Sequence, residues 1–145
     1  MELVITNKLE TDLTDFCNQI IMKMQEYIMI EVNQDHLEVF DNFINQKMQI
    51  PWVSQKMKRP LKTGSLLKAS CQHLKVNNFN NQTYIIKIDS NATIPETYAK
   101  FIDIAKLVNY GNIQLSPYPI ITKMMNYFAD NLDKFYIDYS KGELV

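Results

Sequence analysis

Cys71 and His73 are the residues of this 145-residue chain whose types and spacing come nearest to nucleophilic chemistry. A thiol beside an imidazole can form the pair in which histidine activates a cysteine nucleophile. On a strand these two side chains would point the same way, but no third group stands nearby in the sequence to orient the imidazole. We therefore interpret Cys71 as a residue that lines a sheet and His73 as a residue at the sheet edge, and we expect no catalytic residue here.

The other residues that could carry chemistry are sparse. Cys17 falls within an apolar helical stripe, so we expect a small core residue, and His36 stands in the first turn of a predicted helix, where water solvates it. No spacing of Cys, His or Asp matches a metal-binding motif, and Gly64 and Gly111 are isolated, so no glycine-rich phosphate loop is formed. The sequence therefore predicts a protein that is not an enzyme and holds no metal and no cofactor.

Composition indicates the broad class of the chain. Hydrophobic residues make up 46% of it, which is the share expected of a globular domain, and its length suits one domain spanning 1–145. No apolar stretch approaches the ~18 residues that span a bilayer, and the N-terminus lacks the features of a signal peptide. Two cysteines suit neither a disulfide scaffold nor a metal quartet, so we expect a reducing cytoplasm as the place of folding and no membrane partner.

Hydrophobic periodicity predicts the elements that must position these residues. Apolar residues at intervals of three and four predict helices over 7–30 and 36–48, the second capped by Asp35 with Glu38 completing a capping box. Alternating residues predict a hairpin at about 73–89, with a turn made by its asparagines. Further helices are predicted from Pro95 to Gly111, with Tyr98 on the apolar face, and over 120–140.

These elements indicate one α+β domain. We expect an antiparallel sheet (the hairpin at about 73–89) flanked by long N-terminal and C-terminal amphipathic helices, with an extended arm at 49–62. The predicted core residues are Phe16, Ile20, Met24, Phe128, Leu132 and Phe135.

The arm at 49–62 is where regular periodicity stops. Pro51 and Pro60 disfavour a helix through it, and loops of this length are often functional. It carries the one tryptophan of the chain, an aromatic anchor of the kind that dominates interface energies, together with the densest basic cluster. We interpret it as a segment that docks on a partner, through Trp52, Lys56, Lys58, Arg59 and Lys62.

Charge is strongly segregated along the chain, although its net value is only −1. Residues 1–41 carry nine acids and two lysines, residues 42–88 carry eight bases and no acid, and residues 89–145 carry seven acids and five lysines. Such asymmetry favours subunits that stack an acidic face on a basic face, or a basic edge that faces nucleic acid. The alternative is that folding interleaves these charges and neutralises them. Six of the eight bases in residues 42–88 are Lys56, Lys58, Arg59, Lys62, Lys68 and Lys75. We expect most of them to be exposed in the isolated subunit, clustered on one edge and mostly unpaired within the chain.

The order of short motifs resembles the tail-completion and head–tail joining proteins, the neck-ring family of tailed bacteriophages. The segment 63–70 is similar to that family's T-G-x-L-x-x-S, and 98–103 with Gly111 is similar to its Y-A-x-x-h-E…G, with Asp103 in place of Glu. Pro119 is similar to the proline that opens the family's closing helix. The family-like positions are Thr63, Gly64, Leu66, Ser70, Tyr98, Ala99, Asp103, Gly111 and Pro119.

The resemblance implies a structural virion protein that forms a homo-oligomeric ring, of about 6 or 12 copies, in the neck or tail of a phage and joins head to tail. Its partners would be copies of itself, adjacent portal, connector or tail proteins, and DNA in the lumen through non-specific contacts. It would be assembled in the host cytoplasm and reside in the virion. The alternative is a cytosolic nucleic-acid-binding accessory protein that uses the basic segment 42–88.

Overall fold

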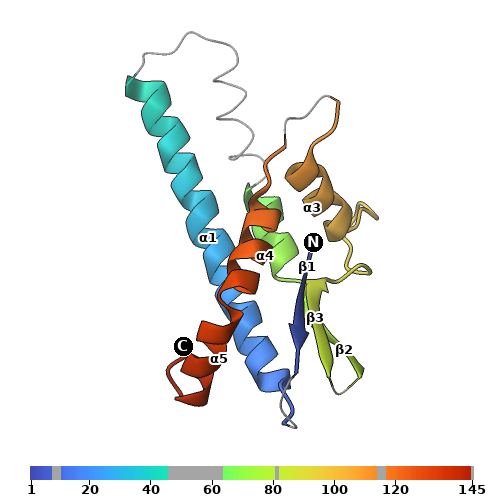
Figure 1. Cartoon of the computed structure of the whole chain (residues 1–145). Coiled ribbons are helices and arrows are strands. Elements are labelled where there is room, and N and C mark those ends of the chain that lie inside the picture. Colours follow the sequence, from blue (N-terminus) through green and yellow to red (C-terminus); the bar gives the residue numbers. More distant parts are fainter. Residues whose placement is uncertain (8–10, 46–63, 81, 114–116, 145) are drawn as a thin grey trace.

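The computed structural model describes residues 1–7, 11–45, 64–80, 82–113 and 117–144. The chain is an α+β protein with an antiparallel sheet, as predicted (Figure 1). In chain order the elements are β1 (Glu2–Thr6), α1 (Thr14–Asn45), a short helix at 64–71, β2 (Leu74–Asn80), β3 (Thr83–Ile88), α3 (Phe101–Tyr110), α4 (Ile120–Asp130) and α5 (Leu132–Ser140).

The sheet has three strands in the order β1-β3-β2, all antiparallel. The β2–β3 hairpin matches the prediction, but Asn77 and Asn78 lie within β2, paired with Ile85 and Tyr84, and not in the predicted turn. Asn80 does serve the turn, since its Oδ1 accepts hydrogen bonds from the backbone N–H groups of Gln82 and Thr83 at 3.0 and 3.1 Å. The third strand, β1, was not predicted. Its alternation of exposed and buried residues is that of a strand with one face on the core.

The N-terminal half is one helix where the sequence predicted two. α1 starts at Thr14 and not near residue 7, because Asp12 caps it: Asp12 Oδ1 accepts from the Thr14 N–H at 2.9 Å and from the Thr14 hydroxyl at 2.7 Å. It then runs without interruption to Asn45. Asp35, the predicted cap of a second helix, lies inside α1, and its carboxylate accepts from the Tyr118 hydroxyl. No Gly or Pro separates the two predicted helices, so the backbone can continue through.

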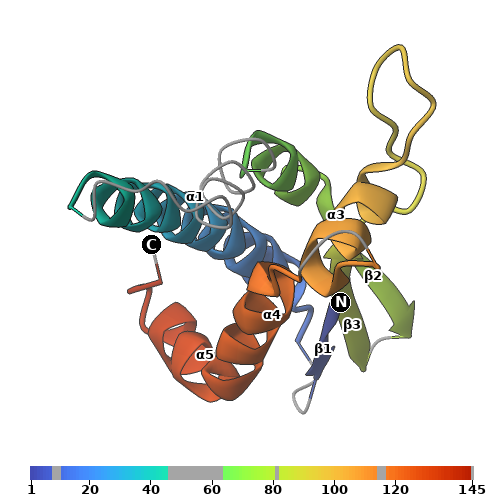
Figure 2. The same ribbon diagram turned by 90° about the horizontal axis from the view of Figure 1, so that it is seen from above.

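The C-terminal helices also differ from the prediction at their ends. α3 starts at Phe101, because Pro95 lies in a turn and not at a helix start. The predicted helix over 120–140 is broken at Asn131, which ends α4 and precedes α5. Asn131 caps the break with its own side chain, since its Nδ2 donates to the Tyr127 carbonyl at 2.8 Å. The break lets α5 turn away from the direction of α4 (Figure 2).

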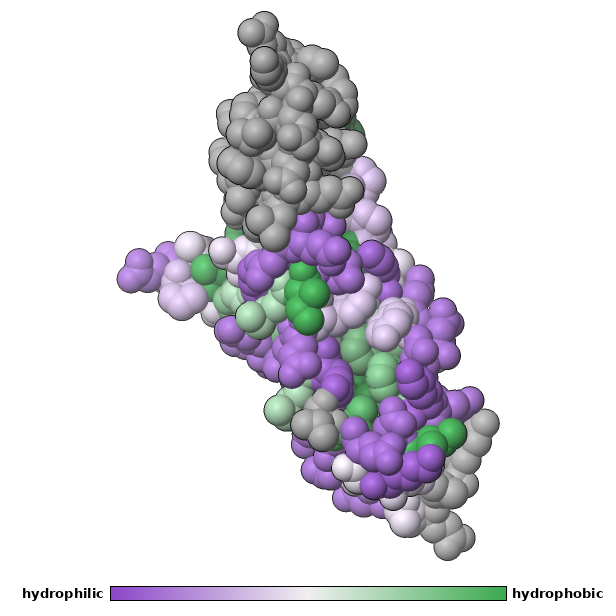
Figure 3. All heavy atoms as spheres, turned by 90° about the vertical axis from the view of Figure 1, so that its left-hand side faces the viewer, coloured by the Kyte–Doolittle hydropathy of each residue, from purple (hydrophilic) through white to green (hydrophobic). Residues whose placement is uncertain are grey.

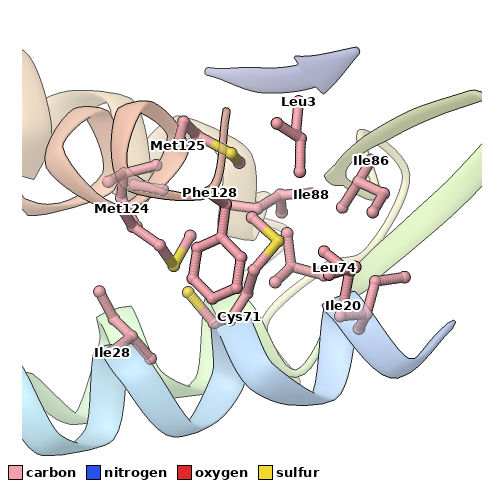
Figure 4. Close-up of a cluster of buried hydrophobic side chains, with 14 of the residues drawn as sticks. Leu3, Ile20, Ile28, Cys71, Leu74, Ile86, Ile88, Met124, Met125 and Phe128 are labelled. Carbon is pink, nitrogen blue, oxygen red and sulfur yellow. The ribbon is translucent and has the colours of Figure 1, made fainter. Parts of the chain in front are cut away.

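The core lies between the sheet and the helices. Leu3, Ile86 and Ile88 point from one face of the sheet toward side chains of α1 and α4 (Figure 4). The aromatic ring of Phe128 lies at the centre of this cluster and is only 2% exposed. Of the predicted core residues, Phe16, Ile20, Met24 and Phe128 are buried, whereas Leu132 and Phe135 are partly buried at its margin.

Candidate functional site

The predicted partner-docking residues lie outside the part of the chain that the structure describes. This holds for Trp52, Lys56, Lys58, Arg59 and Lys62 of the arm at 49–62, and also for Thr63 of the family-like motif. Their role stays a prediction.

The Cys71–His73 pair is arranged differently from the strand that the sequence suggested. Cys71 ends the short helix at 64–71 and His73 follows in a turn, so neither residue is on a strand. Cys71 is fully buried, and burial raises the pKa of its thiol to about 12. The His73 ring stacks on Phe101 with ring centroids 4.5 Å apart. A buried thiol with a raised pKa and an imidazole that packs on an aromatic ring suit structural roles better than a nucleophile pair.

The family-like segment 64–70 forms a helix that packs against the start of α3. Gly64 and Ser70 are buried and Leu66 is half-buried. Ser70 Oγ lies 2.7 Å from the Leu66 carbonyl oxygen, one turn earlier, and 3.4 Å from the Phe101 carbonyl oxygen. The hydroxyl therefore joins the first family-like segment to the second, although 31 residues separate Ser70 from Phe101.

The second family-like segment begins in a two-stranded loop, which we call the 92–101 hairpin. Backbone bonds close it: the Ile94 N–H donates to the Ala99 carbonyl at 2.7 Å, and the Phe101 N–H donates to the Ala92 carbonyl at 3.1 Å. The loop between β3 and α3 extends away from the rest of the molecule (Figure 2).

Tyr98 stands in the turn of this hairpin. The sequence had predicted it on the apolar face of the helix that follows, so this prediction was wrong. Tyr98 is 95% exposed and has a φ of 58°, in the left-handed region that a bulky residue rarely adopts. Glu96, two residues earlier, has a φ of 68°. Two residues other than glycine in this region store backbone strain, which marks the turn as a place to look for function.

The remaining family-like residues lie at or near the ends of helices. Asp103 is exposed in the first turn of α3, where its negative charge suits the helix dipole. Gly111 ends α3 with a φ of 70°, and its N–H donates to the Leu107 carbonyl at 2.8 Å. Pro119 precedes α4 and its carbonyl accepts from the Lys123 N–H at 3.0 Å. These contacts explain the residue types by local geometry.

Two lysines of the basic segment have partners inside the chain. Lys75 forms an ion pair with Asp89 at 3.2 Å, across the strands and two residues beyond its register partner Lys87. The prediction that most of the six basic residues are unpaired stays a prediction, because the other four lie outside the described residues. Lys68 donates a hydrogen bond to the Asn33 side chain of α1. The acids of α1 are also partly used, because Glu31 pairs with Lys123 at 3.1 Å and raises the pKa of that lysine. Folding thus neutralises part of the segregated charge.

A hollow of about 230 Å³ opens between the end of β1 and α5, and we call it the β1–α5 pocket. Among the described residues its walls are mostly apolar, and Thr6, Asn7 and Asp133 contribute polar side chains. The lining residues are Ile5, Thr6, Asn7, Leu13, Phe16, Leu132, Asp133 and Tyr136. Sequence analysis missed this pocket, because it depends on β1. The alternation of residues 2–6 was the signal that could have indicated the strand.

The outer face of α1 carries a row of exposed large apolar side chains. Met22, Met29 and Ile30 are 63%, 51% and 63% exposed, at intervals that place them along one side of the helix. Figure 3 views the molecule from the left-hand side of Figure 1, where α1 lies, and shows hydrophobic patches among hydrophilic ones. Exposed apolar residues that gather on one element favour an interaction surface.

Neither a metal cluster nor a membrane helix is found in the described ranges. No group of three or more His, Cys, Asp or Glu side chains there could hold a metal ion. Within the same residues, no helix combines the length and the apolar character that crossing a bilayer requires.

Comparison with known proteins finds no relative. No protein-family model, no curated protein and no solved structure matches this chain.

Proposed function

We propose that this protein is a structural virion protein that forms a ring in the neck or tail of a tailed phage and joins head to tail. The observation that carries the proposal is the contact between its family-like segments. Gly64 to Ser70 form a helix, and Ser70 bonds to the carbonyl of Phe101 at the start of α3. Segments that resemble one family in order along the chain are thus also packed together, as parts of one structural unit would be.

The surface of the subunit supports the proposal in a second way. A closed ring needs two different contact surfaces on each subunit, since the same interface is repeated head to tail. The row formed by Met22, Met29 and Ile30 lies on the outer side of α1, whereas Val4 is 47% exposed on the sheet face that points away from the core. A subunit with apolar side chains on two such sides has surfaces for neighbours.

In this proposal the long helices flank the sheet as the frame of the subunit, and the arm at 49–62 reaches an adjacent protein. Trp52 would anchor that contact, and the lysines around it would face an acidic partner or the phosphates of DNA in the lumen. Scattered lysines suit a conduit, because DNA must slide past without its sequence being read.

The experiment that tests the ring is native mass spectrometry with negative-stain microscopy of the purified full chain. We expect one closed species whose mass is an integer multiple of 17.0 kDa, with a central hole. The double variant Lys58→Glu/Arg59→Glu should impair assembly and leave the melting temperature nearly unchanged. A matched control is Lys106→Glu/Lys141→Glu, which makes the same charge change at exposed positions on α3 and after α5. A protein that stays monomeric up to millimolar concentration contradicts the proposal.

A further inference from the structure

The 92–101 hairpin and the β1–α5 pocket lie on opposite sides of the molecule. In Figures 1 and 2 the hairpin and α3 are on the right, whereas α5 lies at the lower left. The hairpin begins four residues after the end of β3 and is closed by its own backbone bonds, so its turn cannot reach the pocket of the same chain. One chain thus presents both a protrusion and a hollow, and a 92–101 hairpin that enters this pocket belongs to another molecule.

The turn of the hairpin has the properties of an inserting element. Tyr98 is an aromatic side chain that is almost completely exposed, and tyrosine is among the residues that most often dominate interface energies. Its left-handed backbone costs free energy in the isolated subunit, and a side chain that is 95% exposed buries little area that could offset this cost. A backbone that is already held in this shape loses little further freedom on binding.

The β1–α5 pocket has the size and the chemistry of a site for one aromatic side chain. Its volume of about 230 Å³ is below the ~300–1,000 Å³ of sites that enclose drug-sized ligands. Leu13, Phe16 and Leu132 give it an apolar wall that suits a phenyl ring, and Thr6 and Asp133 offer oxygen atoms that can accept from a phenol hydroxyl.

Backbone groups beside the pocket favour a peptide as the occupant. The Asn7 N–H donates to the Gln82 carbonyl at 2.6 Å, and the antiparallel register continues from this pair through Ile5 and Leu3. Because hydrogen-bonded residues alternate in such a ladder, the N–H and C=O groups of Val4 and Thr6 point away from β3. An edge strand of this kind can pair with an extended segment of another chain.

Charges near the two surfaces are complementary. Lys100 is exposed two residues after Tyr98, and Asp133 lines the pocket. Glu96 is exposed two residues before Tyr98, and Lys134 is exposed next to Asp133. An inserted hairpin would therefore bring Lys100 toward Asp133 and Glu96 toward Lys134. These two pairs of opposite charge favour one orientation of the hairpin in the pocket.

From these observations we propose that the 92–101 hairpin of one copy inserts Tyr98 into the β1–α5 pocket of a second copy. The contact is heterologous, because each copy uses its hairpin toward one neighbour and its pocket toward the other. This inference rests on the proposed ring and names the subunit contact that would close it.

Variants of Tyr98 test the inserted side chain in the full chain. Tyr98→Asn keeps a residue that tolerates the left-handed backbone but removes the ring, so we expect association to weaken about thirtyfold, as for a hot spot, with an unchanged melting temperature. Tyr98→Phe keeps the ring and should weaken association by less than about tenfold, the effect of one hydrogen bond. Sedimentation velocity over a concentration series measures both. The proposal is overturned if Tyr98→Asn self-associates as strongly as the wild type, or if the wild-type chain does not self-associate.

Charge exchange and disulfide trapping test the pocket side. Lys100→Asp and Asp133→Lys should each weaken association, and the two together should restore it. Tyr98→Cys mixed with Asp133→Cys should form a mixed disulfide under oxidised glutathione, faster than Lys106→Cys mixed with Asp133→Cys. Tyr98→Cys alone should not link to itself, because the contact is not symmetric. A self-linked Tyr98→Cys dimer, or a mixed rate equal to the control, overturns the proposal.

The failure of this contact and the failure of the ring are distinguishable by microscopy. Closed rings that persist in Tyr98→Asn overturn the inserted hairpin and leave the ring standing. If microscopy shows open filaments and no closed ring, while Tyr98→Cys and Asp133→Cys still form the mixed disulfide, the inserted hairpin is supported and the ring is overturned.

Discussion

Phe128 is the residue whose replacement should reveal most about the core. Its ring is 2% exposed and lies between α1 and the C-terminal helices, with ring centroids 6.0 Å from Tyr27, 5.4 Å from Tyr127 and 5.2 Å from Phe135. Replacing Phe128 with Ala removes the buried ring and leaves a cavity between α1, near the N-terminus, and the helices α4 and α5, near the C-terminus.

The magnitude follows from burial and from the ring contacts. A buried Phe→Ala change costs ~3–5 kcal/mol, a range that includes the loss of ring contacts, so we expect a loss of about 4 kcal/mol for Phe128→Ala. For a chain near 150 residues each kcal/mol lowers the melting temperature by ~2–4 °C, which corresponds to about 12 °C here.

Urea unfolding followed by far-UV circular dichroism measures this loss, and the slope against urea shows whether the unfolded state has changed. Phe135→Ala is the matched control, because Phe135 contacts the same ring but is only partly buried, and it should cost about half as much. A loss below about 1 kcal/mol for Phe128→Ala, or a larger loss for Phe135→Ala, would refute the packing that we derive.

Three further predictions concern single groups. Tyr84→Phe leaves the buried Leu13 N–H without its 3.2 Å acceptor, so urea unfolding should show a loss of about 1–3 kcal/mol. The hydrogen bonds from Thr14 lower the pKa of Asp12, so the stability that they give is present above the ordinary pKa of the carboxyl group and is lost as pH falls through its lower folded value. The urea concentration at the unfolding midpoint of the wild type should therefore decrease as pH is lowered from about 5 to about 2, and that of Asp12→Asn should decrease less. Cys71 should resist iodoacetamide in the native protein at pH 8 and react after unfolding, because burial raises its pKa to about 12; rapid native alkylation, seen by mass spectrometry, would contradict its place in the core.

Local patterns in the sequence determined the type of most elements. The three- and four-residue spacing of apolar residues predicted the helical stripe through Phe16, Ile20 and Met24, and alternation predicted the β2–β3 hairpin. Both signals arise within a few residues of one another, since a helix or hairpin buries one face of a contiguous segment. The turn chemistry of Asn80 is equally local.

The features that only the tertiary structure determined are those in which residues far apart in the chain come into contact. β1 is five residues long, and it is a strand because it pairs with β3, about 80 residues away. The union of two predicted helices into α1 depends on packing and on the contact of Asp35 with Tyr118. The β1–α5 pocket exists only where β1, α1 and α5 meet, so periodicity within any one of them could not indicate it.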